Sequence, residues 1–222
     1  MGIIRYLDTD PLLFISLVIC LIFSLCFHEY SHGIVAYYFG DDTAYKYGRL
    51  TLNPFAHLDV IGSILILFIG IGYAKPVPVN QLKLRNPRTD IVKVAAAGPI
   101  SNLLLCFIGI LIFHLLKTNI DHTVSLFLQI FISINAALAV FNLLPVYPLD
   151  GGQIFGNLLS YKYPKYSNYL LEYGPKILFG IILFGIITGY SILWIIISPV
   201  INFIITFFES IIILIMKILN VF

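Results

Sequence analysis

The sequence predicts an all-α integral membrane protein with about five membrane-spanning helices. Of its 222 residues, 59% are hydrophobic and only 11% are charged, whereas a soluble domain carries about 25% charged residues. The mean hydropathy is +0.97. Long apolar runs separated by short polar loops are typical of helices that cross a hydrocarbon core of about 30 Å. We therefore expect a lipid bilayer around the chain, and without a basic stripe we expect no nucleic-acid partner.

Five apolar runs are long enough to span a bilayer as helices. They cover residues 11–39, 91–116, 124–144, 177–197 and 199–219, with the last two separated near Ser198-Pro199. Pro11 suits the first turn of a helix, and Gly40 suits the position just after its end. We expect one membrane-embedded domain over residues 1–222, with a core at about 11–160 and two C-terminal helices at about 177–219.

Two shorter segments follow the first run. Residues 45–52 alternate in polarity and are rich in β-forming residues, which predicts a short β-strand or hairpin near the cytoplasmic face. Residues 61–73 are apolar but include three glycines and are too few to cross the membrane as a helix. We interpret this second segment as re-entrant.

The run 11–39 contains the motif His28-Glu29-Tyr30-Ser31-His32. A helix advances about 100° per residue, so His28 and His32 lie on one face and can bind a single metal ion. Glu29 lies beside them and can accept a proton from a metal-bound water. The alternative is a packed pair of histidines with a buried glutamate, which is costly because an unpaired carboxylate is expensive in hydrocarbon.

A catalytic zinc needs three protein ligands and an open position for water. Asp150 is the best candidate for the third ligand, because it is the only acidic residue from 122 to 171 and follows two prolines that interrupt the helix. Its alternative role is to cap a helix that resumes at Gly151. His57, on the same side, is a rival ligand, a contact for substrate or an ordinary loop residue. His114 and His122 are rivals toward the opposite side.

The distribution of Lys and Arg orients the chain. If residues 61–73 re-enter, 11 of the 13 basic residues lie on one side, which the positive-inside rule makes cytoplasmic. Arg5 and Lys117 lie on the other side. If residues 61–73 cross, the division is 10 to 3, so charge alone leaves both topologies open. Re-entrance places the inner end of the motif helix, residues 98–102 and Asp150 on one side, as a shared site requires.

The chain resembles the site-2 protease family of intramembrane zinc metalloproteases, in its compact bacterial branch without PDZ or CBS domains. The resemblance covers roughly residues 24–160. Besides His28–His32, it is carried by Gly48–Asp59, Ala74–Asn80, Leu84–Arg88, Gly98-Pro99-Ile100-Ser101-Asn102 and Pro148-Leu149-Asp150-Gly151-Gly152.

The resemblance implies one Zn²⁺ per chain held by His28, His32 and Asp150, with Glu29 as the catalytic base. It also suggests that Asn102 holds the substrate or stabilises the oxyanion. The implied enzyme is a multi-pass protein of the cell (inner or plasma) membrane, with its site toward the cytoplasm and a transmembrane protein or peptide as substrate. A metal-ion transporter and a non-catalytic membrane binding protein are the alternative classes.

The re-entrant interpretation predicts the outcome of cysteine accessibility labelling. Tyr45→Cys and Arg85→Cys should both react with a membrane-impermeant thiol reagent added on the cytoplasmic side, because the segment between them does not cross the bilayer. Labelling of the two positions from opposite sides would refute the re-entrant topology.

Overall fold

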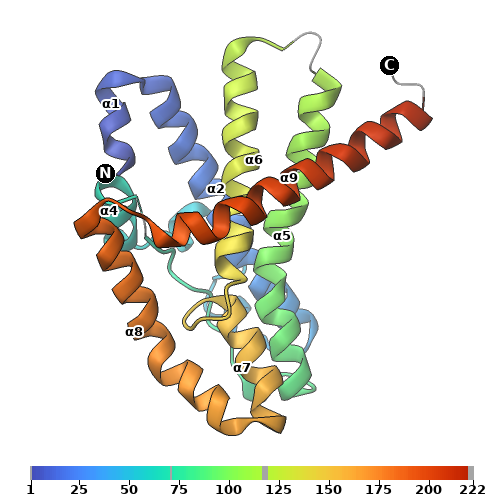
Figure 1. Ribbon diagram of the computed structural model, residues 1–222. Coiled ribbons are helices and arrows are strands. Elements are labelled where there is room, and N and C mark those ends of the chain that lie inside the picture. The colour runs from blue at the N-terminus through green and yellow to red at the C-terminus, as the bar shows by residue number, and fades with distance from the viewer. Residues whose placement is uncertain (1, 71, 117–119, 220–222) are drawn as a thin grey trace.

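The computed structural model describes residues 2–70, 72–116 and 120–219; Lys117, used in the charge count above, lies outside them. Within these ranges the regular secondary structure is helical throughout, and five helices are long and apolar enough to cross a membrane. They are α2 (Pro11–Tyr38), α5 (Pro87–Leu116), α6 (His122–Asn142), α8 (Pro164–Thr188) and α9 (Ile192–Ile218) (Figure 1). The chain is a multi-pass membrane protein, as its composition predicts.

The remaining helices are short and lie between or before the long ones. They are η1 (Ile3–Arg5), α1 (Tyr6–Thr9), α3 (Thr43–Lys46), η2 (Pro54–Ala56), α4 (Val60–Phe68), η3 (Gln81–Lys83) and α7 (Asp150–Lys162). Of these, α7 follows α6 after a loop and leads into α8.

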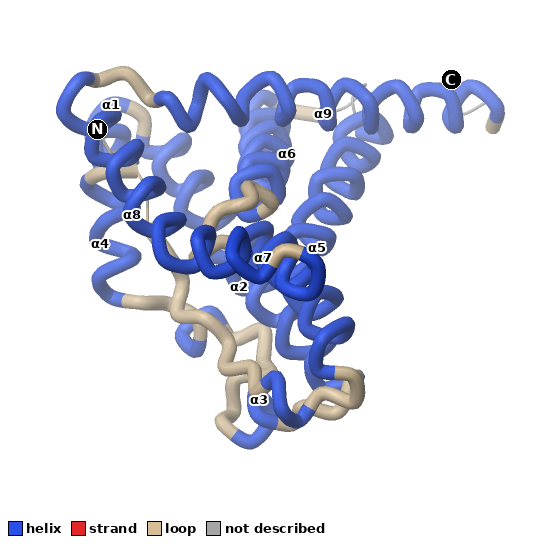
Figure 2. The backbone as a smooth tube through the Cα atoms, turned by 60° about the horizontal axis from the view of Figure 1, so that its bottom comes forward, coloured by secondary structure: helices blue, strands red, loops and turns tan. Residues whose placement is uncertain are grey.

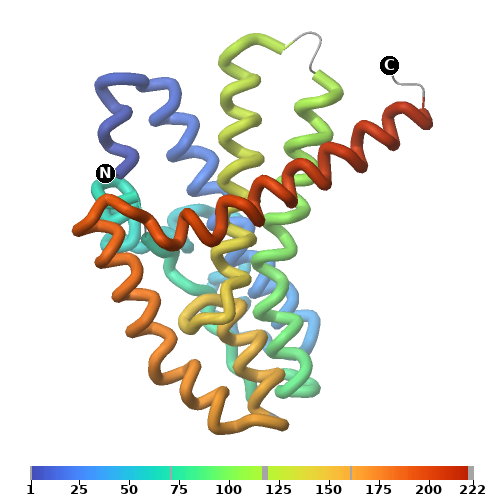
Figure 3. Tube along the Cα trace, viewed as in Figure 1, coloured from blue at the N-terminus to red at the C-terminus, as the bar shows by residue number. Residues whose placement is uncertain are grey.

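Helices α2, α5 and α6 form the centre of the bundle, and α9 runs obliquely across α5 and α6 (Figures 1 and 3). An apolar cluster joins α5, α6 and α9, with Cys106 and Ile110 from α5, Ile132 and Ala136 from α6, and Ile212 among the residues of α9. Helix α8 stands at the edge of the bundle and contacts α7 and α9. The first three predicted spans thus match observed helices closely, within a few residues at each end.

The predicted break between the two C-terminal helices is wrong. Helix α8 begins at Pro164 and ends at Thr188, where Gly189 adopts a left-handed conformation with φ 76°. The Ser191 side chain then accepts a hydrogen bond from the Trp194 amide and caps α9. Pro199 lies inside α9, because a proline in a membrane helix is tolerated where neighbouring helices and local adjustments compensate for the lost hydrogen bond.

The predicted strand at 45–52 is also wrong. Its first residues belong to the helical turn α3, Gly48 is left-handed with φ 65°, and the Arg49 amide donates to the Ala44 carbonyl at 2.8 Å. The structure contains no strand or hairpin in the described ranges. Alternating residues make a strand only where another strand takes up their backbone hydrogen bonds, and here the turn takes them up locally.

The segment after α3 extends only part of the way along the bundle. Helix α4 has nine residues, and the Phe68 carbonyl at its end accepts a hydrogen bond from the Gly2 amide at 2.9 Å. The connection that follows is a long loop that descends toward α3 (Figure 2). It returns to the end of α2, where the Arg85 amide donates to the Phe39 carbonyl at 2.9 Å.

An exposed ion-pair network holds the end of this loop next to the residues that follow α2. Asp42 lies 2.6 Å from the Lys46 ammonium and 2.9 Å from that of Lys83, and these two lysines hold the pKa of Asp42 at about 2, below its ordinary 3.8. Because the folded-state pKa is lowered, the pairs stabilise the fold above about pH 4, and this contribution disappears as the pH falls toward 2.

We therefore expect the melting temperature of the wild-type protein in detergent to fall more steeply than that of Asp42→Asn between about pH 5 and about pH 2. The difference should shrink in high salt, which screens exposed charges. Thermal unfolding followed by circular dichroism measures both effects, and parallel curves at low salt would contradict the assignment.

Candidate metal centre

The two motif histidines lie on one face of α2, as their spacing predicts. His28 and His32 are 4% and 8% exposed, and their Nε2 atoms are 3.1 Å apart. Their rings meet at 83°. Both Nε2 atoms therefore point to the same buried space.

Asp150 lies with the two histidines in a group of three residues that could hold a metal ion. Its Oδ2 lies 3.1 Å from the Nε2 of His28, and its Oδ1 lies 3.4 Å from the Nε2 of His32. Asp150 is the first residue of α7, and the residue at the N-cap position is Leu149, which forms no capping bond. The Asp150 side chain faces the histidines and does not cap the helix, so the capping alternative is not observed. Its position at a helix N-terminus favours a negative charge.

The glycine after Asp150 lets the preceding loop pack directly against α7. A Cβ atom on Gly151 would lie 2.3 Å from the carbonyl oxygens of Leu143 and Leu144. Only a residue without a Cβ atom allows this approach. The loop that leaves α6 can therefore turn sharply and deliver the Asp150 carboxylate to α2.

The donor atoms and the space between them fit a zinc ion. A Cβ atom on Gly98 of α5 would lie 2.4 Å from the Nε2 of His32 and 2.5 Å from that of His28, so the glycine leaves open the space that both nitrogens face. Tetrahedral zinc with Zn–N bonds of about 2.0–2.1 Å separates two ligand nitrogens by about 3.3 Å, close to the 3.1 Å observed. Two imidazoles and one carboxylate form a usual zinc donor set.

The second ring nitrogen of each histidine has its own partner. The Nδ1 of His32 lies 2.7 Å from the Val94 carbonyl, which can only accept, so Nδ1 carries the proton and Nε2 keeps its lone pair. The Nδ1 of His28 lies 2.6 Å from the Oδ1 of Asn102. Such partners orient metal-binding histidines and fix their tautomers.

Glu29 is half-buried next to the histidines and is held by the backbone of a neighbouring segment. Its Oε2 accepts a hydrogen bond from the Val77 amide at 2.8 Å. Val77 belongs to an extended stretch, residues 74–80, whose two ends are also fixed. The Lys75 amide donates to the His57 carbonyl at 2.7 Å, and the Asn80 amide donates to Asp41 at 2.6 Å. One carboxylate oxygen of Glu29 is thus oriented by the fold.

The structure places Asn102 within the site and His57 outside the group of ligands. Asn102 is fully buried, and its amide group contacts His28, Asn135 and Ser24. Among the described residues, the potential metal-binding group contains His28, His32 and Asp150. It includes none of the rivals His57, His114 and His122. The substrate roles of Asn102 and His57 stay predictions.

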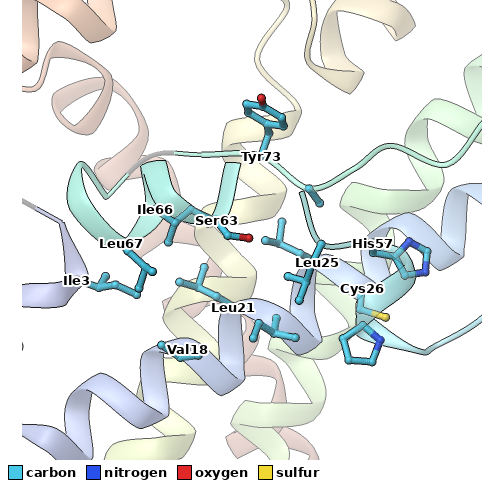
Figure 4. A pocket seen from close by; sticks show the side chains of 14 residues that line it. Ile3, Val18, Leu21, Leu25, Cys26, His57, Ser63, Ile66, Leu67 and Tyr73 are labelled. Carbon is cyan, nitrogen blue, oxygen red and sulfur yellow. The ribbon is translucent and has the colours of Figure 1, made fainter. Parts of the chain in front are cut away.

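His57 instead lines an apolar cavity of about 190 Å³ between α2 and α4. Figure 4 shows Leu21 and Leu25 of α2 facing Ser63 and Ile66 of α4, with His57 at one end. The Nε2 of His57 donates to the Thr51 carbonyl at 2.7 Å. Cys26, three residues before Glu29, also lines the cavity. The cavity therefore ends about one helical turn of α2 before Glu29.

The roles of three residues at the site were not predicted from the sequence. Gly98 was expected near the site together with residues 99–102, but the open space that it leaves beside the histidines was not expected. Val77 acts through its backbone amide, which leaves no mark in the side-chain pattern. Asn135 is a fully buried polar residue in an apolar run, and this contrast was the one signal that could have revealed it.

Comparison with known proteins gives the following similarities. A sequence model of peptidase family M50 matches residues 110–184. YwhC of Bacillus subtilis, named as a zinc metalloprotease, is 48% identical over 154 residues, which cover 64% of this chain and 68% of YwhC. Rip2 of Mycolicibacterium smegmatis is 29% identical, over 68% of this chain and 62% of Rip2. The zinc metalloprotease MJ0392 of Methanocaldococcus jannaschii is 24% identical, over 80% of this chain and 44% of MJ0392. No solved structure matches significantly.

The open space beside Gly98 leads to a test of the metal centre. Gly98→Ala should lose zinc binding, because the added methyl group would occupy the space that both Nε2 atoms face. Bound zinc, measured by atomic absorption after dialysis against a weak chelator, should be absent from this variant. Gly180→Ala in α8 is the matched control, since a Cβ atom there meets nothing within 4 Å. A Gly98→Ala protein with wild-type zinc content would contradict the assigned metal position.

Proposed function

Because this chain belongs to peptidase family M50, it is an intramembrane zinc metalloprotease, and we propose that His28, His32 and Asp150 hold its Zn²⁺ while Glu29 is the general base. The observation that carries this assignment is the buried triangle of two Nε2 atoms and one carboxylate, with edges of 3.1, 3.1 and 3.4 Å. The similarities give no support to a transporter or a non-catalytic binding protein.

The chemistry follows from the positions of these groups. When bound at this site, Zn²⁺ supplies a Lewis acid that polarises the scissile carbonyl and makes water a better nucleophile at neutral pH. The Val77 amide holds the Oε2 of Glu29, which leaves Oε1 to accept the proton of the attacking water and then deliver it to the leaving amine. The low exposure of His28, His32 and Asp150, between 4% and 8%, keeps bulk water away from the reacting groups.

We propose that the segment containing α4 enters the membrane and returns on the same side. Two contacts at its ends support this topology: the Lys83 ammonium pairs with Asp42, and the Arg85 amide bonds to Phe39, which follows α2. At its far end, Leu67 of α4 lines the cavity together with Ile3 and Val18. Val18 lies seven residues into α2, so α4 stops short of that end of the bundle.

We propose that the His32 end of α2 faces the cytoplasm. The loops at this end contain Lys46, Lys83 and Arg85, and Arg49 donates to the carbonyls of Lys75 and Pro76 in the same region. An excess of basic residues in short loops marks the cytoplasmic side of a membrane protein. The metal centre then lies toward the cytoplasmic side, about two helical turns of α2 before its end at Tyr38.

The substrate of an intramembrane protease is a membrane protein, and its helical peptide bonds are protected by their own hydrogen bonds. The substrate must therefore unwind before cleavage. We propose that the unwound stretch lies along residues 74–80, which are extended, pass beside Glu29 and are fixed at both ends. The apolar cavity near Cys26 offers room for an apolar side chain of the substrate.

We also propose that the C-terminal helices belong to the same domain as the catalytic core. Leu178 of α8 and Leu193 of α9 form an apolar cluster with Leu149, the residue immediately before Asp150. Helix α9 also joins the cluster formed by α5 and α6. Contacts of this kind are expected within one folding unit and stabilise the loop that presents the third ligand.

Substitution of the proposed base separates chemistry from metal binding. Glu29→Gln should lower the cleavage of a transmembrane peptide by about 10²- to 10⁴-fold, the usual contribution of general base catalysis, while the bound zinc stays at the wild-type level. Peptide cleavage in detergent, with and without a chelator, measures the activity, and metal analysis of the same samples measures the zinc. Glu172→Gln is a suitable control, since Glu172 is exposed on α8 and pairs with Lys176 at 3.7 Å. Full activity of Glu29→Gln would rule out Glu29 as the base.

A further inference from the structure

We propose that Asn135 of α6, acting through Asn102, is a positioning residue that holds His28 in the one tautomer able to bind Zn²⁺ through Nε2. This inference rests on the proposed function, because it takes His28 as a zinc ligand. It concerns residues on three helices, since Ser24 of α2, Asn102 of α5 and Asn135 of α6 form one connected group behind the metal centre.

These three side chains are each 0% exposed and lie inside an apolar helical bundle. Burial of amide and hydroxyl groups in such surroundings is unfavourable unless each finds a hydrogen-bond partner. Every polar atom of the two asparagine side chains has at least one partner. The group therefore forms a complete hydrogen-bond network. The orientation of both asparagine amides can be deduced from a partner that can only accept a hydrogen bond.

That partner is the backbone carbonyl of Phe131. One terminal atom of the Asn135 amide lies 2.8 Å from this carbonyl and 2.9 Å from the Ser24 hydroxyl. A carbonyl oxygen only accepts hydrogen bonds, so this atom must be the NH₂ group of Asn135. The other terminal atom, which is the oxygen Oδ1, then faces Asn102 at 2.9 Å.

The orientation of the Asn135 amide determines that of the Asn102 amide. Asn102 must offer its NH₂ group to the oxygen of Asn135, and the same NH₂ group lies 3.3 Å from the Ser24 backbone carbonyl. The Oδ1 of Asn102 is then left facing the Nδ1 of His28 at 2.6 Å. An oxygen acceptor there requires a proton on Nδ1, which leaves the lone pair of Nε2 free for the metal.

A reversed Asn102 amide would have the opposite effect. Its NH₂ group would face Nδ1, favour a lone pair on that atom and place the proton on Nε2, where it blocks metal binding. His32 needs no such support, because the partner of its Nδ1 is the Val94 backbone carbonyl, which cannot reverse. His28 depends on a side-chain amide, and Asn135 keeps that amide in the productive orientation.

Zinc affinity of full-length variants in detergent, measured by competition with a chromogenic chelator, tests the proposal. Asn135→Leu keeps a similar size but removes the acceptor for Asn102, and the zinc affinity should fall about 10- to 100-fold, as for other residues that support metal ligands. Asn157→Leu is the matched control: the Asn157 side chain also donates to the carbonyl four residues earlier, at 2.7 Å, but does not contact the network. Its affinity should equal that of the wild type.

Asn135→Asp distinguishes orientation from simple packing. A carboxyl group buried there should be neutral, because burial disfavours its charged form. It would then accept from Asn102 through its carbonyl and donate through its hydroxyl. We expect Asn135→Asp to bind zinc more tightly than Asn135→Leu. The melting temperatures of these two variants without zinc should be equal. Equal weakening in both variants would overturn the proposal.

A measurement on the wild-type chain does not depend on the stability of the Asn135 variants. In the zinc-free protein labelled with ¹⁵N-histidine, His28 should show its proton on Nδ1, with the signal assigned by its loss in His28→Gln. An Nδ1 of His28 without a proton, unchanged zinc affinity in Asn135→Leu, or an equal loss in Asn157→Leu would each overturn the role of Asn135. A wild-type protein that binds no zinc would instead overturn the proposed function, so the two failures are distinguishable.

Discussion

The cost of placing polar groups in an apolar bundle is the constraint on which this structure depends. Two histidines, a carboxylate and two asparagines lie at the centre of the molecule with almost no exposure, and each must be paired there or destabilise the fold. The protein meets this requirement by directing all of them toward one place. The metal centre and its supporting network are therefore also the polar interior of the bundle, and the helices are packed around it.

Much of the metal centre could be predicted from sequence because its determinants are local. The spacing of His28 and His32 follows from helix geometry alone, and the apolar surroundings made their chemistry conspicuous. Asp150 stood out because acidic residues are scarce in that half of the chain. The remaining features depend on tertiary contacts. The space beside Gly98 exists only because α5 packs against α2, and the support of Glu29 comes from a backbone amide that any residue type except proline could supply.

The errors in the predicted fold have physical causes of the same kind. A strand was expected at residues 45–52 from alternation and composition, yet β-propensity mainly reflects packing against neighbouring strands, and the described chain offers none. The last two spans were expected to separate near Ser198-Pro199, and proline does end most helices in water. In this helix Pro199 is accommodated, and the actual turn is made by Gly189 and capped by Ser191. The apolar runs were thus easier to detect than the residues at which the helices end.

The location of the three proposed ligands on two different helices has a further consequence. His28 and His32 belong to α2, whereas Asp150 begins α7, which continues directly into α8. An ion that binds all three side chains is a cross-link between the start of the chain and its C-terminal third. Binding to the folded state alone makes stability rise with the logarithm of free metal concentration once the site is largely occupied. The proposed site thereby links the stability of the folded chain, and not only its activity, to the concentration of free zinc.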